Sequence, residues 1–117
     1  MQNFLAVFTG TEASMGRWQQ LSEAERQQRE QAGMAAWEAW GRRHADAIVD
    51  DGAPLGKTKR VTAQGVADVR NDLAAYTVVR AESLEAAARM FEGHPHFAIF
   101  PGDGVDVMPC LPIPGRD

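Results

Sequence analysis

The stretch QNFLAVFT, residues 2–9, decides how the rest of the chain is arranged. Apolar side chains occupy both sets of alternate positions: Phe4, Ala6 and Phe8 on one face, Leu5 and Val7 on the other. Successive side chains of a strand point to opposite faces of a sheet. A strand that is apolar on both faces is typical of the centre of a sheet that is covered twice. We therefore expect residues 2–9 to form a central strand.

A long helix is expected to follow this strand. Residues 22–25, SEAE, match a capping box, in which the Ser oxygen accepts from a free backbone N–H and the Glu side chain reaches back to the Ser N–H. The residues that follow are rich in Gln, Glu, Arg and Ala, which favour helix, so the helix is placed at Glu23–Arg43. Spacings of four, three and four positions put one set of residues on a common face: Gly33, Trp37, Trp40 and His44.

A second helix is expected to begin after Ser83, which is a suitable N-cap. Gly93 followed by His94-Pro95 is a stop signal for this helix. The spacing i, i+3, i+4, i+7 defines its apolar face: Leu84, Ala87, Ala88 and Phe91. The second helix should therefore pack this face against the sheet.

Three further stretches are expected to be strands: residues 47–49, Leu73–Ala81 and residues 105–108. Residues 57–62 are polar but compatible with a strand, which is typical of an edge strand or a hairpin arm, and residues 50–56 are rich in turn formers. Residues 13–20 and 63–71 are expected to be loops. The first of these loops contains Trp18, which either closes the end of the core or forms the wall of a pocket or of a partner surface.

The resulting order, β-α-β(β)-β-α-β, is typical of the split βαβ, or ferredoxin-like, pattern. We expect an α+β fold with a four-stranded antiparallel sheet and both helices on one face. The strands are apolar on both faces, however, and two helices cover only one. A second copy of the sheet is the simplest cover for the other face, so a homodimer is predicted. The chain is expected to be a single domain, residues 1–117, in which residues 109–117 form an extended proline-rich tail.

The composition restricts the classes of partner. Of the 117 residues, 44% are hydrophobic and 24% charged, with a net charge of -4. The acidic balance argues against sequence-independent binding to nucleic acid, which needs a basic surface. No apolar run approaches the ~20 residues of a transmembrane helix, and the N-terminus lacks the features of a signal peptide, so we expect a cytoplasmic protein that does not enter membranes. The single cysteine, Cys110, excludes an intramolecular disulfide and a cysteine-based metal cluster.

Several stretches, taken in order, resemble the YCII-related (YCII/DGPF-like) family. They are FLAVFTG, WGRRHADAIVDDGAPLG, YTVVRAESLEAAARMFEGHPHF and GVDVMP. Members of this family adopt the dimeric α+β barrel fold, so the resemblance implies that two subunits pair through their sheets. In some members, a His early in the first long helix and an Asp lie in a cleft and have been proposed to act in catalysis. The corresponding stretch here, residues 29–35, REQAGMA, has no His, so the resemblance does not supply this pair.

The most distinctive local motif is Gly93-His94-Pro95-His96. Imidazole titrates near neutrality and therefore suits acid–base catalysis or metal binding. Three interpretations of His94 are open: a structural cap of the helix end, a catalytic or ligand-contacting residue, and a metal ligand together with His96. Because two His residues alone do not complete a metal site, we predict neither a metal nor a cofactor.

His44 is a second candidate for acid–base chemistry. Acidic residues lie close to it in the sequence, between positions 46 and 51, and a carboxylate beside a His raises its pKa and determines its tautomer. His44 either complements the helix dipole at the basic last turn of the helix or lines an aromatic pocket with Trp37 and Trp40.

The pocket is expected between the long helix and the sheet, where a small apolar ligand would fit. Its predicted lining is Trp37, Trp40, Tyr76 and His96, and the candidate catalytic residues are His94 and His44. One hypothesis is a small-molecule-binding domain or a cofactor-independent enzyme that uses a His as acid or base. The alternative is a non-catalytic module that senses a ligand or joins protein partners. Convergent polar groups in the pocket favour the enzyme, and a closed, dry interior favours the module.

Overall fold

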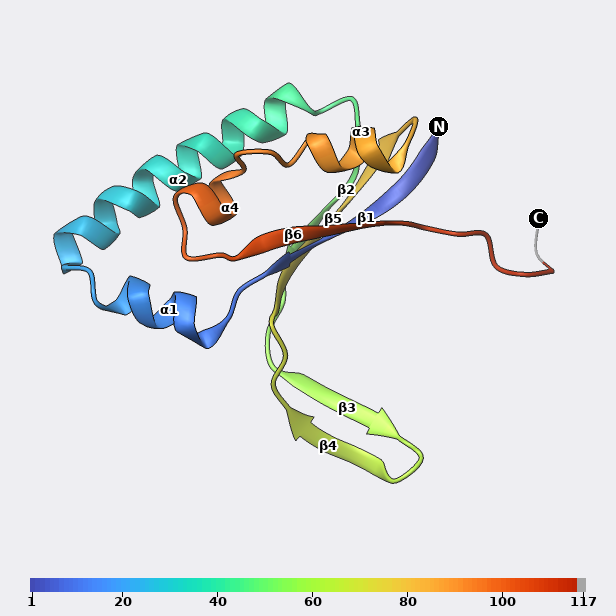
Figure 1. The fold of residues 1–117 in the computed structure, drawn as a ribbon, viewed down its shortest axis with the longest axis horizontal. Helices are drawn as coiled ribbons and strands as arrows, with labels where there is room; N and C mark the ends of the chain where they lie inside the picture. The colour runs from blue at the N-terminus through green and yellow to red at the C-terminus, as the bar shows by residue number, and fades with distance from the viewer. Residues whose placement is uncertain (116–117) are drawn as a thin grey trace.

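A computed structural model describes residues 1–115 of the chain, and its centre is a four-stranded sheet (Figure 1). The strands are β1 (Gln2–Thr9), β2 (Ile48–Pro54), β5 (Leu73–Ala81) and β6 (Gly104–Pro109). Their order is β2-β5-β1-β6, and all neighbouring strands are antiparallel. The predicted four-stranded antiparallel sheet is thus confirmed, and β1 lies inside it with a neighbour on each side.

Helices cover one face of this sheet (Figure 1). The long helix α2 has the predicted bounds, Glu23–Arg43, and begins with the predicted capping box. The short helices α3 (Leu84–Arg89) and α4 (Pro95–Ala98) lie on the same side of the sheet. The buried apolar core lies between these layers and consists of Phe4, Ala6, Phe8, Trp40, Val79, Ala81, Ala87 and Phe91.

The opposite face of the sheet has no helix over it (Figure 1). Its centre is a row of paired residues in which Leu5 of β1 lies between Val78 of β5 and Met108 of β6. Leu5 and Val78 are half-buried, and Met108 is 39% exposed. We refer to this surface as the open face.

Strands β3 (Thr58–Thr62) and β4 (Gly65–Val69) form a separate hairpin that projects from the body of the molecule (Figure 1). Of the two alternatives for residues 57–62, an edge strand or a hairpin arm, the structure has the hairpin arm. The expectation of a loop at residues 63–71 is wrong. Every residue of β4 except Val69 is exposed. A strand with no buried face lacks the apolar periodicity by which a strand is recognised, so the sequence did not indicate β4.

The expectation of a loop at residues 13–20 is also wrong, because helix α1 spans Glu12–Gln19. Thr11 caps this helix, since its side-chain oxygen accepts from the backbone N–H of Ser14 at 3.3 Å. The backbone N–H of Thr11 in turn donates to the Asp103 carboxylate at 2.5 Å. This support comes from a residue 92 positions away, so local sequence patterns could not reveal it.

Strand β2 extends beyond the predicted residues 47–49 and through much of the turn-rich stretch 50–56. The pairing of β2 with β5 shifts register between Ile48 and Ala53. Gly52 adopts a φ of 71° within this irregular segment, a conformation that glycine adopts without steric cost. The turn-forming residues therefore produce a bulge inside the strand instead of ending it.

The second helix is shorter than its apolar pattern suggested. Of its predicted buried face, Ala87 and Phe91 are buried, but Leu84 is 46% exposed and Ala88 is also exposed. The stretch after Pro95 forms the single turn α4. The predicted face was therefore wrong at Leu84 and Ala88. Ala87 is the buried residue of α3, and Ala88 is turned about 100° away from it around the helix axis. The buried Phe91 follows the last residue of this helix.

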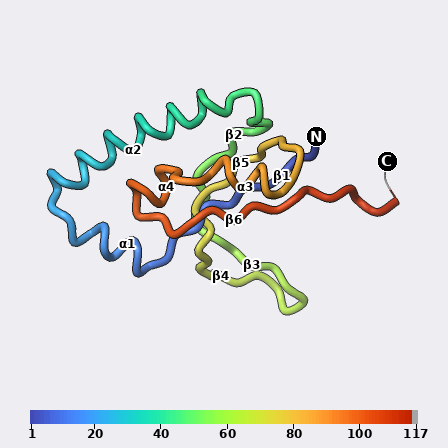
Figure 2. The backbone as a smooth tube through the Cα atoms, turned by 45° about the horizontal axis from the view of Figure 1, so that its top comes forward, coloured from blue at the N-terminus to red at the C-terminus, as the bar shows by residue number. Residues whose placement is uncertain are grey.

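Residues 110–115 follow β6 and leave the body of the molecule (Figure 2). Of the predicted tail 109–117, Pro109 is the last residue of β6, and residues 116 and 117 lie outside the described residues. None of the helices in residues 1–115 has the length and apolar character that crossing a bilayer requires.

Candidate functional site

A cavity of about 630 Å³ separates α2 from strands β2 and β5. Its walls are mostly apolar side chains and glycine, and its borders include Met34, Trp37, Trp40 and Gly41 of α2, Ile48, Gly52, Ala53 and Pro54 of β2, Ala74, Ala75, Tyr76 and Thr77 of β5, and Phe8, His96 and Phe100. Carboxylates of Glu38 and Asp51, which belong to exposed residues, also border it. We call this space the main cavity.

All four residues predicted to line a pocket border the main cavity. Trp40 is held in place by its Nε1–H, which donates to the Met90 carbonyl at 2.7 Å. Trp37 meets the ring of Phe8 edge-on, with centroids 5.3 Å apart. Tyr76 pairs with Val7, and strand alternation therefore places its side chain on the open face, away from Phe8.

His96 is the one imidazole that borders the main cavity. Its Nε2 lies 2.8 Å from the carbonyl oxygen of Thr9. A carbonyl can only accept a hydrogen bond, so Nε2 carries the proton and donates it to Thr9. In the neutral ring, Nδ1 then has a free lone pair. No hydrogen bond is made to this Nδ1 within residues 1–115.

The ring of His96 is tightly held in this orientation. A Cβ built on Gly102 would lie 2.2 Å from Nε2 of His96, so only glycine permits this approach. On its other side, the ring lies 5.1 Å from that of Phe8, measured between centroids. The side chain is 8% exposed. The sequence placed His96 in the pocket but did not indicate this orientation, because Thr9 is 87 positions away.

His94 lies beneath the main cavity wall and does not border the cavity. It is 1% exposed and caps α4, since its Nδ1 accepts from the backbone N–H of His96 at 3.0 Å. Its Nε2 therefore carries the proton, and this buried atom has no hydrogen-bond partner in the described chain. The rings of Trp37 and Trp40 stand nearly perpendicular to it at 4.5 and 4.8 Å, so π faces are the available acceptors.

Burial, followed by the charges of His96 and His44, lowers the pKa of His94 to about 4. The ring is thus neutral at physiological pH. It is poorly placed to exchange protons with a ligand, because neither nitrogen faces the main cavity.

His44 is the C-cap residue of α2 and is half-buried. Its ring lies 5.0 Å from that of Trp40, but it does not border the main cavity. Burial lowers the pKa of His44, and the neighbouring Arg43 lowers it further. The expectation that nearby carboxylates raise this pKa is therefore wrong, because desolvation disfavours the charged ring and the charge of Arg43 acts in the same direction.

A polar cluster at α1 was not anticipated from the sequence. The buried hydroxyl of Ser14 donates to Asp103 at 2.5 Å and accepts from Arg17 Nη2 at 2.9 Å. The hydrogen bond from Ser14 is the largest cause that lowers the pKa of Asp103. The hydrogen bond from the backbone N–H of Thr11 is the second cause. The carboxylate thus remains ionised and joins β6 to α1.

No group of three or more His, Cys, Asp or Glu side chains within residues 1–115 is arranged to hold a metal ion. His94 and His96 each use one ring nitrogen in a hydrogen bond to the backbone.

The fold is similar to that of a solved enzyme structure. This is 5-chloro-2-hydroxyhydroquinone dehydrochlorinase from Burkholderia phenoliruptrix AC1100, in complex with 2,5-dihydroxybenzoquinone. The two chains share 16% sequence identity with a TM-score of 0.57, and the match covers 98% of this chain and 99% of the other. No family model and no curated protein matches the sequence. The likeness shows a common fold over almost the whole chain.

Proposed function

We propose that the protein binds a small cyclic organic molecule in the main cavity, and that His96 exchanges a proton with it. The observation that carries this proposal is one oriented imidazole at the border of a mostly apolar space. A mostly apolar pocket with few, well-placed polar groups is the common form of a small-molecule site. Such a site needs no cofactor for acid–base chemistry.

The orientation of His96 supports its role as acid or base. A general base works best when its ring is fixed and one nitrogen is free to meet the substrate. The Thr9 carbonyl fixes the Nε2–H of His96, which leaves Nδ1 as the nitrogen that takes the proton. The flat walls formed by Trp37 and Phe8 favour a planar ring as ligand.

The comparison enzyme supports the same class of ligand. Its complex contains 2,5-dihydroxybenzoquinone, a small ring with ionisable hydroxyl groups. This compound is therefore a suitable first probe of the main cavity, although the shared fold alone does not establish a shared reaction.

We also propose that two copies pair through their open faces, in the ferredoxin-like dimeric α+β barrel arrangement of the YCII-related family. The support is the apolar row on that face, Leu5, Val78 and Met108, which has no covering layer in one chain. Pairing would remove these side chains from water, which is favourable in proportion to the apolar area buried.

Binding is tested by filling the main cavity. Gly41 borders it, and a Cβ there would meet no atom within 4 Å, so Gly41→Leu introduces a side chain without a clash. We expect this variant to bind 2,5-dihydroxybenzoquinone at least about tenfold more weakly in calorimetry, since the ligand would have to displace a buried Leu. Gly16→Leu is the matched control, because Gly16 is also helical and unobstructed but does not border the cavity. Equal binding by both variants would place the ligand elsewhere.

Proton transfer is tested with the same probe in D₂O, by the loss of its ring C–H signal in proton NMR. Delivery of a deuteron to a ring carbon, followed by removal of the proton, changes only the isotope. We expect the wild-type protein to accelerate this exchange and His96→Gln to reduce the acceleration about a hundredfold while binding persists. Binding without accelerated exchange would instead support the non-catalytic sensing module.

A further inference from the structure

A second, smaller pocket of about 300 Å³ lies between α1, the start of α2 and the segment around α4. It is separate from the main cavity, and the ring of Phe100 borders both. This ring can sit between the pockets because residue 33 is glycine: a Cβ on Gly33 would lie 2.5 Å from Phe100 Cε2. Trp18 lies on the far side of the same ring, with centroids 6.2 Å apart. We call this space the second pocket.

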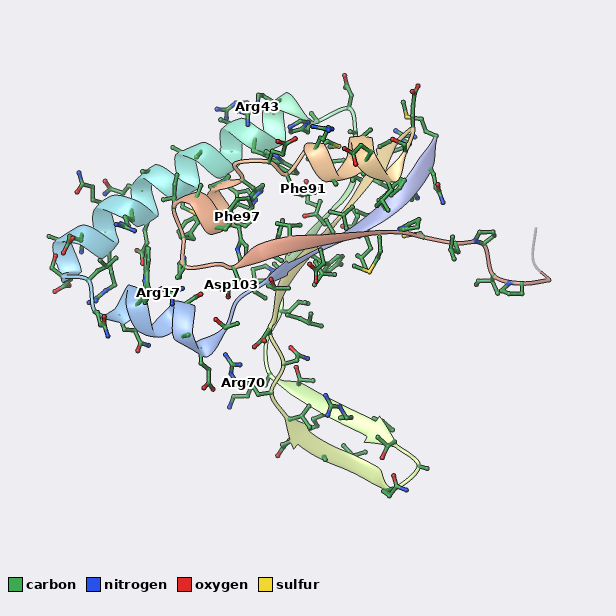
Figure 3. All side chains as sticks on the ribbon, in the orientation of Figure 1. Arg17, Arg43, Arg70, Phe91, Phe97 and Asp103 are labelled. Atoms are coloured by element: carbon green, nitrogen blue, oxygen red, sulfur yellow. The ribbon has the colours of Figure 1, made fainter. Side chains whose placement is uncertain are left out.

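The second pocket combines aromatic walls with positive charge. Its borders include the apolar residues Trp18, Leu21, Phe97, Ile99 and Phe100 and the two arginines Arg17 and Arg29. Figure 3 shows Arg17 on α1 and Phe97 on α4, which approach this region from different elements.

Neither arginine has a carboxylate partner within residues 1–115, whereas Arg42, Arg70 and Arg89 do. Arg17 donates to Ser14 Oγ at 2.9 Å, which restrains the guanidinium at the pocket. The charges of Arg17 and Arg29 contribute to the lowered pKa of Asp103 and of Glu25, respectively. Neither acidic residue borders the second pocket, whereas both arginines do.

We infer that the second pocket binds an aromatic carboxylate, with its ring against Trp18 and Phe100 and its carboxylate between Arg17 and Arg29. A guanidinium matches the planar, two-oxygen geometry of a carboxylate. The aromatic walls exclude water from the ring and select an organic anion over an inorganic one. This site is independent of the proposed function of the main cavity.

The test measures binding of phenylacetate by ¹H–¹⁵N NMR, with the indole N–H signals as reporters. We expect the Trp18 signal to shift on titration, and phenylacetamide, acetate and inorganic phosphate each to bind at least about fivefold more weakly. Arg29→Gln should weaken phenylacetate binding about fivefold, in the range of exposed ion pairs, and Arg17→Lys should do so by removing the planar fork. Arg43→Gln is the matched control, because Arg43 lies at the other end of α2 (Figure 3) and should leave the affinity unchanged.

Three outcomes overturn the inference. Equal affinity for phenylacetate and phenylacetamide would show that the arginines do not recognise charge. Equal affinity for phenylacetate and phosphate would show that the aromatic walls do not recognise the ring. A shift of the Trp37 signal without the Trp18 signal would place phenylacetate in the main cavity, which would leave the proposed function intact and remove this site.

Discussion

His94 and His96 are two residues apart and have opposite roles in the structure. The backbone N–H of His96 donates to Nδ1 of His94. The imidazole of His94 thus positions the backbone that carries the imidazole of His96. His94 is enclosed by aromatic rings, whereas His96 borders the main cavity. The Gly93-His94-Pro95-His96 motif thus contains one imidazole that caps α4 and one that borders the main cavity.

The buried His94 predicts a specific dependence of stability on pH. Its pKa is lowered from 6.5 to about 4 in the folded protein, so between these values the unfolded chain binds a proton that the folded chain does not. The free energy of unfolding should therefore be unaffected by this group above pH 6.5 and fall as the pH drops from 6.5 to 4, by about 3 kcal/mol in total. Urea unfolding across this range measures the slope.

The matched variants are His94→Asn, which retains an N-cap acceptor, and His44→Gln. We expect His94→Asn to lower stability overall and to flatten the pH dependence, and His44→Gln to leave most of the slope. An unchanged slope in His94→Asn would show that His94 is not the group responsible.

At the scale of elements, β2 shows how a turn-forming sequence becomes part of a strand. The Asp50 carboxylate accepts from the Gly52 N–H at 2.8 Å, and Thr77 Oγ1 donates to the Asp51 carbonyl at 3.1 Å. These bonds satisfy polar groups at the bulge, where the regular ladder with β5 is interrupted. The bulge also forms part of the main cavity border, because Asp51 and Gly52 both line it.

Replacing Gly52 should disrupt this bulge. A Cβ at Gly52 would lie 1.7 Å from the Tyr76 carbonyl oxygen, and its φ of 71° is unfavourable for other residues. We expect Gly52→Ala to lower the free energy of unfolding by more than about 2 kcal/mol, measured by urea denaturation.

Gly56→Ala is the control for this substitution, because a Cβ on Gly56 would meet no atom within 4 Å and the residue has no positive φ. It should leave stability within about 0.5 kcal/mol. Equal stability of the two variants would mean that β2 accommodates a side chain by shifting away from β5.

At the scale of the whole molecule, the open face and the projecting hairpin give the chain an uneven shape. The axes measure 54 × 43 × 19 Å, and the radius of gyration is 16.3 Å, whereas a compact chain of this length would have a radius of about 13 Å. The hairpin and the C-terminal segment extend away from the sheet and helices (Figure 2). An exposed apolar surface such as the open face is typical of subunits that contact a second chain.

Pairing through the open face predicts a dimer in solution. Sedimentation at micromolar concentration should give twice the mass of one chain, and Val78→Lys should shift the protein to monomer because it places a charge in the paired surface. Val61→Lys is the control, because Val61 is 75% exposed on the hairpin. A wild-type monomer, or dissociation by both substitutions alike, would contradict pairing through this face.

Local signals determined much of the fold. The capping box at Ser22 and the apolar alternation of β1 each act within a few residues, so the sequence alone placed α2 and the central strand. The stop predicted at Gly93 lies beyond the end of α3 at Arg89. The helical spacing likewise placed Trp37 and Trp40 on one side of α2, the side that borders the main cavity.

Only the tertiary structure decided which histidine borders the main cavity with a nitrogen that makes no hydrogen bond, and that the short helix α1 lies between β1 and α2. The carbonyl of Thr9 orients His96 from 87 positions away, and the carboxylate of Asp103 supports the cap of α1 from 92 positions away. These contacts form when the chain brings the end of β1 against the segment that leads into β6. Because a hydrogen bond depends on distance and angle in space, no pattern of neighbouring residues contains that information.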